Sequence, residues 1–261
     1  QSFDVSYFPP IYSYTYDLPN ITTRLTRRFT RNPSAKYTSR YGRIPGLFSP
    51  AENYNFWKKW FPEHPVLGHH LPSALIDNEI IANANKTLGS ITQIAGKQFA
   101  FKNVYFTLAI GSLLKTFTNA RVILVRRNLE SIAASVYRRR NELHNKRLWW
   151  SIRPPFSETV QSMDLMTQVA FQCVRSEQLM ELELAKDKTD RSFVTHYDDV
   201  CDSPREIISE IADWLGVTFK KRKHSKLPDR FQQSKSAYFT EEQARLFRSI
   251  ASSMHTDKDK Y

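Results

Sequence analysis

The side chains best suited to chemistry in this sequence follow one apolar run, residues 121–125. Arg127 comes just after the run, Asn128 then starts a predicted helix, and Ser131 and Ser135 lie four residues apart on one face of it. A guanidinium beside the free N–H groups of a helix N-terminus is a preformed site for phosphate or sulfate. Arg127 and Ser135 are therefore candidates for an anion site, although a solvated strand end and a helix surface would show the same spacing.

The elements that must position these residues follow from hydrophobic periodicity. Residues 121–125 predict a central parallel strand buried on both faces, and residues 98–101 and 192–197 predict two more strands. Helices are predicted at about 21–30, 50–61, 73–95, 107–117, 128–141, 157–185 and 204–215, with a last one starting at 240. This alternation indicates an α/β fold with a mostly parallel sheet, in a single domain over residues 1–261. Arg127 then lies at the carboxyl end of a strand, where ligands of such sheets bind.

Two segments carry the pattern of a helix start. Ser49 and Glu52 match the N-cap and N3 positions of a capping box, and Ser203 and Glu206 match them again. In both segments a proline occupies the first helical position.

Charge and composition bound the function classes. The 261 residues include 38 Lys and Arg against 26 Asp and Glu, a net charge of +12, which implies an anionic partner: nucleic acid, a membrane surface or a small phosphate- or sulfate-bearing ligand. Cys173 and Cys201 allow one disulfide at most and no cysteine-based zinc site. No His, Asp or Glu spacing predicts a metal site, and no apolar run reaches the roughly 18 residues of a membrane span.

The strand, Arg127 and Ser135 together resemble the 3′-phosphate-binding segment of sulfotransferases that use PAPS (3′-phosphoadenosine 5′-phosphosulfate). In that family an apolar strand leads into R-D-P-R-D-x-x-x-S, whose Arg and Ser hold the 3′-phosphate. The resemblance assigns this role to Arg127 and Ser135. The chain departs from the pattern at Asn128, Leu129 and Glu130, where Asp-Pro-Arg is common.

Three further segments, residues 99–103, 149–155 and 193–216, resemble the same family in the same order. The resemblance implies a P-loop-like three-layer fold, PAPS as the co-substrate, no metal, and transfer of a sulfuryl group to a hydroxyl or amine of a carbohydrate, lipid or small metabolite. The resemblance also allows Tyr197 to pack against adenine, although a tyrosine at a strand end commonly lies in the protein core or at its rim.

The catalytic residues are less well marked than the phosphate ligands. Sulfuryl transfer needs a base for the acceptor proton and a cation for the leaving phosphate oxygen. Lys102 is the candidate cation, but Val104 stands where cytosolic family members have a histidine. Glu52 and His70 are the candidate bases, with a helix-capping role and a solvated loop position as their respective alternatives.

One family hallmark has no match. None of the seven glycines lies in a loop of the type K/R-S-G-T-S/T, which cradles the 5′-phosphosulfate, and the nearest, Gly111, falls inside a predicted helix. Because the chain starts at Gln1, we expect either that this loop precedes it or that the protein is a degenerate relative. The alternatives to a sulfotransferase are thus a non-catalytic or truncated nucleotide-binding relative and, second, a basic nucleic-acid-binding module. The absence of a visible targeting segment favours the cytoplasm; the oligomeric state stays open.

Overall fold

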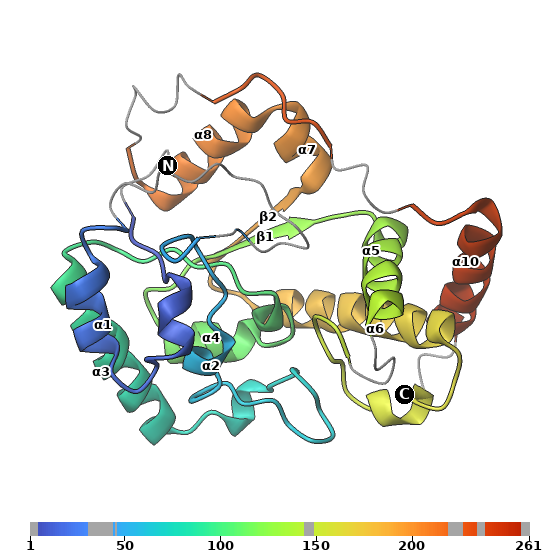
Figure 1. Cartoon of the computed structure of the whole chain (residues 1–261), viewed down its shortest axis with the longest axis horizontal. Helices are drawn as coiled ribbons and strands as arrows, with labels where there is room; N and C mark the ends of the chain where they lie inside the picture. The colour runs from blue at the N-terminus through green and yellow to red at the C-terminus, as the bar shows by residue number, and fades with distance from the viewer. Residues whose placement is uncertain are drawn as a thin grey trace.

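A parallel pair of strands forms the sheet of the described chain. The computed structural model describes residues 5–30, 44, 46–143, 149–218, 227–233 and 238–256. In these ranges β1 (Val122–Arg126) pairs with β2 (Ser192–His196), with Val122 opposite Ser192 and Arg126 opposite His196 (Figure 1). The register brings the carboxyl ends of both strands to the same edge.

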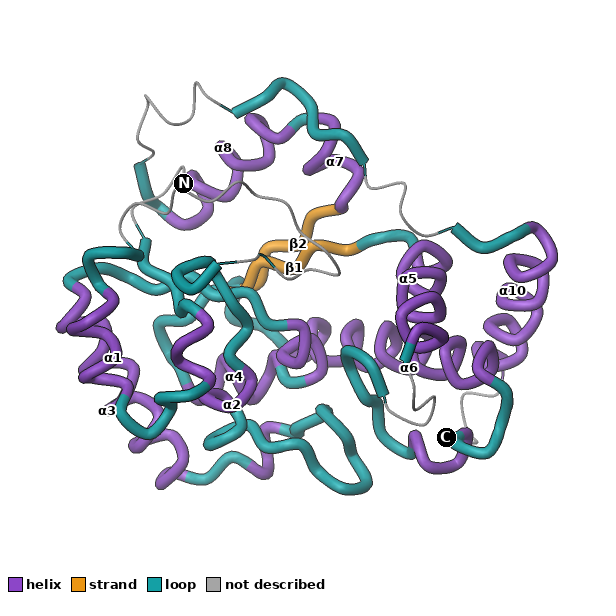
Figure 2. The backbone as a smooth tube through the Cα atoms, viewed as in Figure 1, coloured by secondary structure: helices purple, strands orange, loops and turns teal. Residues whose placement is uncertain are grey.

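Helices surround this pair and supply its connection. The α-helices are α1 (Pro19–Thr26), α2 (Tyr54–Trp57), α3 (Asn78–Ala95), α4 (Ile110–Thr116), α5 (Leu129–Glu142), α6 (Leu165–Lys186), α7 (Tyr197–Asp202), α8 (Pro204–Leu215) and α10 (Glu241–Thr256), and short 3-10 helices span Pro10–Ser13, Ser73–Leu75, Val104–Leu108 and Ser157–Val160. Parallel strands need a long crossover, and α5 and α6 lie between β1 and β2 along the chain (Figure 2).

Helices cover both faces of the sheet. On one face Val122 and Leu124 pack against a cluster from α4 and α6. On the other, Phe193 lies 5.5 Å, centroid to centroid, from Trp214 of α8. The predicted α/β fold with helices on both faces of a parallel sheet is confirmed.

Two larger cores lie beside the sheet. The first is mostly aromatic and joins the N-terminal segment, α2, α3 and α4 around residues such as Phe8, Phe56 and Trp57. The second joins α5, α6 and α10 through small and aliphatic side chains and Phe247.

The prediction that the strand at residues 121–125 is buried on both faces is wrong. Ile123 and Val125 are 42% and 49% exposed. Both point to the face that α8 covers, but Trp214 of α8 packs on Phe193 of β2. In the described ranges β1 pairs with β2 alone, so it is not flanked by a strand on each side as a central strand is.

The predicted helix over 50–61 is also wrong at its start. Asn53 has a left-handed backbone (φ 51°), and its side-chain amide donates to the carbonyls of Phe8 and Ala51. A helix cannot continue through that conformation, so α2 starts only at Tyr54 and ends at Trp57. Glu52 is therefore outside any helix and is not part of a capping box.

Two other helices start later than predicted, because their N-cap residues lie inside the predicted ranges. Asp77 caps α3 and Asp164 caps α6, each accepting a backbone N–H. Ser203 precedes α8 as predicted but makes no side-chain capping bond. The predicted strand at 98–101 is a single parallel bridge between Ser6 and Phe99.

Three negative findings apply to the described ranges. Cys173 and Cys201 are both buried and not disulfide-bonded. No cluster of three or more His, Cys, Asp or Glu side chains suits a metal ion. Among the helices described, none has the length and apolar character to cross a membrane.

Candidate active site

Arg127 and Tyr197 meet at the carboxyl edge of the sheet. They directly follow Arg126 and His196, which are opposite each other in the register. The Arg127 guanidinium lies over the Tyr197 ring at 4.4 Å from the centroid. Two residues that the sequence singled out for nucleotide binding, 70 positions apart, are thus brought into contact.

The neighbouring Arg126 has a different environment. Its Nη2 is 2.8 Å from Glu181 Oε1 and 3.1 Å from Glu177 Oε1, both on α6, and these bonds raise its pKa. Successive side chains of a strand point to opposite faces, and Arg126 is on the face that α6 covers. Arg127 is the one that faces the start of α7.

The helix after Arg127 starts with a side-chain cap. Asn128 Oδ1 accepts the Ser131 N–H at 3.0 Å and lies 3.4 Å from the Ser131 hydroxyl. Glu130 in the first turn pairs with Arg248 of α10 at 2.8 Å. Ser135 is half-buried one turn beyond Ser131. Because Ser131 is engaged by the cap, Ser135 is the more suitable hydroxyl for a ligand.

Two of the candidate catalytic residues also contact each other. Lys102 Nζ forms an ion pair with Glu52 Oε1, joining segments 50 residues apart. The Lys102 side chain is 60% exposed and that of Glu52 is 31% exposed, so the pair is open to solvent. A cation and a carboxylate at one accessible point are the two groups that sulfuryl transfer requires.

The third candidate, His70, belongs to another cluster. Its Nε2 lies 3.7 Å from Oε1 of Glu183, a carboxylate that is 3% exposed. Glu183 also accepts the Gly111 N–H at 3.0 Å and pairs with Lys186 at 3.1 Å. Burial opposes ionisation of Glu183, but these partners outweigh it and lower its pKa. Gly111 lies within α4, with its N–H bound to Glu183 instead of facing a phosphate.

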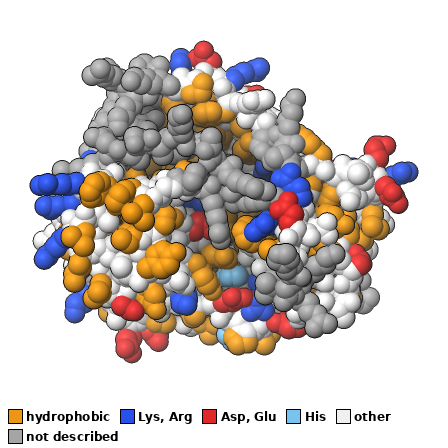
Figure 3. All heavy atoms as spheres, in the orientation of Figure 1, with side chains coloured by type: hydrophobic (Ala, Val, Ile, Leu, Met, Phe, Trp, Pro, Cys, Tyr) orange, Lys and Arg blue, Asp and Glu red, His pale blue; other side chains and the backbone are white. Residues whose placement is uncertain are grey.

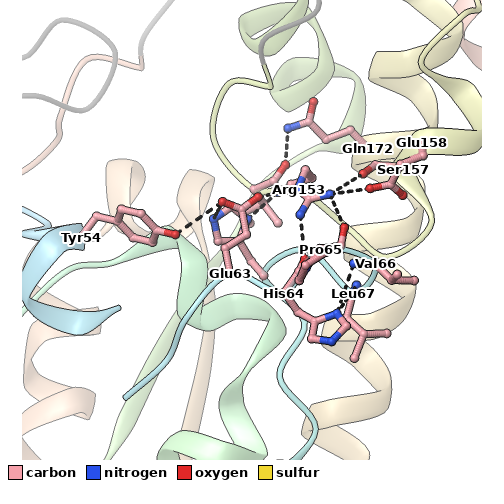
Figure 4. A network of polar contacts seen from close by, with 12 residues as sticks. Tyr54, Glu63, His64, Pro65, Val66, Leu67, Arg153, Ser157, Glu158 and Gln172 are labelled. Carbon is pink, nitrogen blue, oxygen red and sulfur yellow. Dashed lines mark hydrogen bonds and ion pairs between the residues drawn. The ribbon is translucent and has the colours of Figure 1, made fainter. Parts of the chain in front are cut away.

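A network that the sequence analysis missed surrounds Arg153. Its guanidinium forms an ion pair with Glu63, donates to the carbonyls of His64 and Pro65 at 2.7 and 3.0 Å, and contacts Glu158 at 2.8 Å (Figure 4). The side chain is only 13% exposed. It fixes the loop at residues 63–69 to the segment that contains Arg153, and the only sequence signal for it was the family resemblance of residues 149–155.

This loop holds His69 in a defined state. His69 Nδ1 accepts the Arg153 N–H at 2.8 Å, which leaves the proton of the neutral ring on Nε2, and the ring stacks on Tyr105 at 4.2 Å. Burial lowers the pKa of His69 to about 4, against the opposing charge of Glu63. The imidazole is therefore neutral at physiological pH.

Aromatic side chains form a narrow pocket next to His69. It is lined in part by Tyr54, Trp57, Phe61, Asn103, Tyr105 and Phe106, and has room for about one water-sized group. Trp57 Nε1 and Asn103 Nδ2 are buried with no hydrogen-bond partner among the described residues. Asn103 directly follows Lys102, and Tyr54 is two residues from Glu52, so the pocket and the ion pair share two segments.

Comparison with known proteins decides the family. A model of the sulfotransferase family matches residues 21–221, more than half of the chain and a range that contains all six candidate residues. The chain belongs to the sulfotransferase family. A search of curated protein sequences gives no match.

Two solved sulfotransferase structures are similar in part. Sulfotransferase STF9 from Mycobacterium avium shares 15% sequence identity, with 92% of this chain and 64% of that chain covered and a TM-score of 0.49. The sulfotransferase domain from the curacin biosynthetic pathway shares 15%, with 70% and 62% covered and a TM-score of 0.40. The present chain thus spans less than two thirds of either structure.

Proposed function

We propose that this sulfotransferase takes its sulfuryl group from PAPS and transfers it to a hydroxyl or amine of a carbohydrate, lipid or small metabolite. The observation that carries the proposal is the position of Arg127, over Tyr197 at the carboxyl ends of both strands and beside the capped start of α5. A cation, an aromatic face and a helix N-terminus at one edge suit an adenine nucleotide with a phosphate on its ribose.

In this proposal each residue at the edge has one role. Arg127 donates two parallel hydrogen bonds to the 3′-phosphate, and the Ser135 hydroxyl donates a third. Tyr197 packs against the adenine ring. Arg126 contributes little, because Glu177 and Glu181 already satisfy it.

Lys102 and Glu52 supply the chemistry. PAPS brings an activated S–O–P linkage: a new bond forms between sulfur and the acceptor atom, and the bond to the bridging phosphate oxygen breaks. Glu52 accepts the acceptor's proton, and Lys102 stabilises the charge on the phosphate that departs as adenosine 3′,5′-bisphosphate. The contact between Glu52 and Lys102 supports Glu52 over His70 as the base.

A calorimetric titration with adenosine 3′,5′-bisphosphate tests the site. Arg127→Ala is expected to weaken binding by roughly 10- to 100-fold, because it removes charge-assisted bonds to a phosphate. Adenosine 5′-phosphate, which lacks the 3′-phosphate, should bind wild type and Arg127→Ala about equally.

The matched control is Arg245→Ala, which removes the same charge from an exposed position on α10. It should leave the affinity for both nucleotides unchanged. Unaltered affinity of Arg127→Ala for the bisphosphate would exclude Arg127 as a ligand of the 3′-phosphate. An equal loss of affinity for both nucleotides would mean that Arg127 contacts another part of the nucleotide.

A further inference from the structure

Helix α1 buries polar residues and exposes apolar ones. Its buried residues are Thr22, Thr23 and Thr26, whereas Ile21 and Leu25 are 53% and 69% exposed. An amphipathic helix on a globular protein normally shows the reverse arrangement. The apolar stripe of α1 therefore faces away from the body of the protein.

The threonines can be buried because each hydroxyl has a partner within the fold. Thr23 and Thr26 each donate to the carbonyl four residues earlier at 2.7 Å, and Thr22 donates to the Thr15 hydroxyl at 2.6 Å. The Tyr12 hydroxyl lies 2.5 Å from that of Thr23. The contacts with Thr15 and Tyr12 join α1 to the preceding segment with its threonines inward, which leaves the apolar residues outside.

The stripe continues beyond both ends of the helix. Leu18 is 56% exposed, and Phe29 is 54% exposed although one face of its ring stacks on Phe48 at 4.5 Å. These two residues extend the spacing of Ile21 and Leu25 to steps of three, four and four residues. We define these four residues as the α1 stripe. Figure 3 shows apolar side chains with Lys or Arg at their rim in the region where Figure 1 places α1.

Cations flank the α1 stripe. Arg24, Arg27 and Arg28 are all exposed. Between residues 5 and 30 Asp17 is the sole acidic side chain, and it pairs with Lys59 at 2.6 Å. Arg24 and Arg28 each follow a residue of the stripe by three positions, so the charge beside the exposed apolar residues is strongly positive.

We propose that the α1 stripe docks on a lipid bilayer that contains anionic lipids. Leu, Ile and Phe side chains insert into the headgroup boundary, and the three arginines contact lipid phosphates and carboxylates. A second copy of the chain is a poorer occupant, because a two-fold contact would place these arginines against each other. This surface is separate from the proposed nucleotide site and does not depend on it.

Vesicle flotation tests the proposal. The full chain should float with vesicles of phosphatidylcholine and phosphatidylserine, and less with phosphatidylcholine alone. The double variant Ile21→Ser/Leu25→Ser should lose roughly tenfold or more in affinity, since two apolar side chains no longer enter the bilayer. Leu75→Ser/Leu182→Ser is the matched control, because these residues are 51% and 53% exposed outside the stripe and should bind as wild type.

Charge is tested by the triple variant Arg24→Gln/Arg27→Gln/Arg28→Gln, which should lose the preference for phosphatidylserine. Thermal unfolding checks that each variant is folded. Failure of wild type to float with phosphatidylserine vesicles, or equal flotation of the Ile21→Ser/Leu25→Ser variant, overturns the proposal. So does a wild-type dimer in light scattering that this variant converts to a monomer, because a second copy then covers the stripe.

Discussion

Arg126 ends β1 and Arg127 follows it, and the two arginines have different surroundings. Arg126 is held by Glu177 and Glu181 of α6, whereas Arg127 lies over Tyr197. Side-chain alternation along a strand sends the two guanidiniums to opposite faces. A test of nucleotide binding should therefore separate the two positions even though they are neighbours.

Glu52 and Lys102 make a second residue-scale prediction. Glu52→Gln should lower turnover of sulfuryl transfer from PAPS by about 10²- to 10⁴-fold, the usual contribution of a positioned base. Lys102→Met should also lower turnover, with adenosine 3′,5′-bisphosphate affinity largely retained in both variants. Turnover is measured with radiolabelled PAPS over a panel of hydroxyl and amine acceptors.

Controls for that experiment come from exposed positions on α3. Glu79→Gln and Lys86→Met should retain wild-type turnover. Full activity of Glu52→Gln would show that Glu52 is not the base. A wild-type chain that binds the nucleotide but sulfates no acceptor would favour the non-catalytic alternative.

His69 predicts how stability depends on pH. Burial lowers its pKa from 6.5 to about 4, so between these values the unfolded chain binds a proton that the folded chain does not. Its contribution to the free energy of unfolding is fully present above about pH 6.5 and is lost as the pH falls towards 4. The loss between pH 7 and pH 5 is about 2 kcal/mol.

Urea unfolding at the two pH values measures this effect. His69→Phe keeps the stack on Tyr105 but has no titratable ring, so its free energy of unfolding should fall by about 2 kcal/mol less than that of wild type. His255→Gln, on the exposed side of α10, is the control and should behave as wild type. Equal pH dependence of His69→Phe and wild type would show that His69 does not titrate in this way.

At the scale of elements, the loop at residues 63–69 depends on a close backbone approach. Gly68 has φ +60°, and a Cβ added there would lie 2.1 Å from the carbonyl oxygen of Arg153. The same carbonyl accepts the His69 N–H at 2.8 Å. The loop therefore combines a left-handed residue with a contact that leaves no space for a side chain.

Gly68→Ala compared with Gly96→Ala separates these two effects. Gly96 has φ +64° but no atom within 4 Å of an added Cβ, so its substitution should cost only about 1–2 kcal/mol of backbone strain. Gly68→Ala should cost about 1–3 kcal/mol more, because backbone must move. The free energy of unfolding of both variants is measured. Equal losses would mean that the loop at residues 63–69 accommodates the added Cβ with no further loss of stability.

At the scale of the whole molecule, α10 completes a core that starts more than a hundred residues earlier. Phe247 is 3% exposed and packs in the cluster of α5 and α6. Arg248 beside it pairs with Glu130 at the start of α5. The last helix thus supports the element that carries the proposed nucleotide site.

Phe247→Ala should lower the free energy of unfolding by about 3–5 kcal/mol, the cost of removing a buried phenylalanine from a packed core. Leu246→Ala is the control, because Leu246 is 49% exposed and should cost below about 1 kcal/mol. Urea unfolding of both variants provides the comparison. Similar losses for both would mean that α10 is not part of the cooperative core.

The parts of the fold that the sequence predicted are those with local causes. The helix from Asn128, the helix from Pro204 to Leu215 and the helix end at Gly96 all follow from caps and periodicity within a few residues. Arg127 and Ser135 were predicted as ligands in the same way, by their spacing after a strand, and that role stays a prediction. A local pattern failed at Asn53, whose bonds to Phe8 and Ala51 keep the helix predicted over 50–61 from starting before Tyr54.

By itself the sequence determined the α/β class, the strand that leads to Arg127 and the helix after it. Tertiary structure alone decided that Glu52 meets Lys102, that Arg153 holds the loop at 63–69, and that α1 turns its threonines inward. Local elements depend on interactions three or four residues apart, which a sequence pattern records. Contacts between segments 50 or more residues apart depend on how all the elements pack together, and no local pattern encodes that packing.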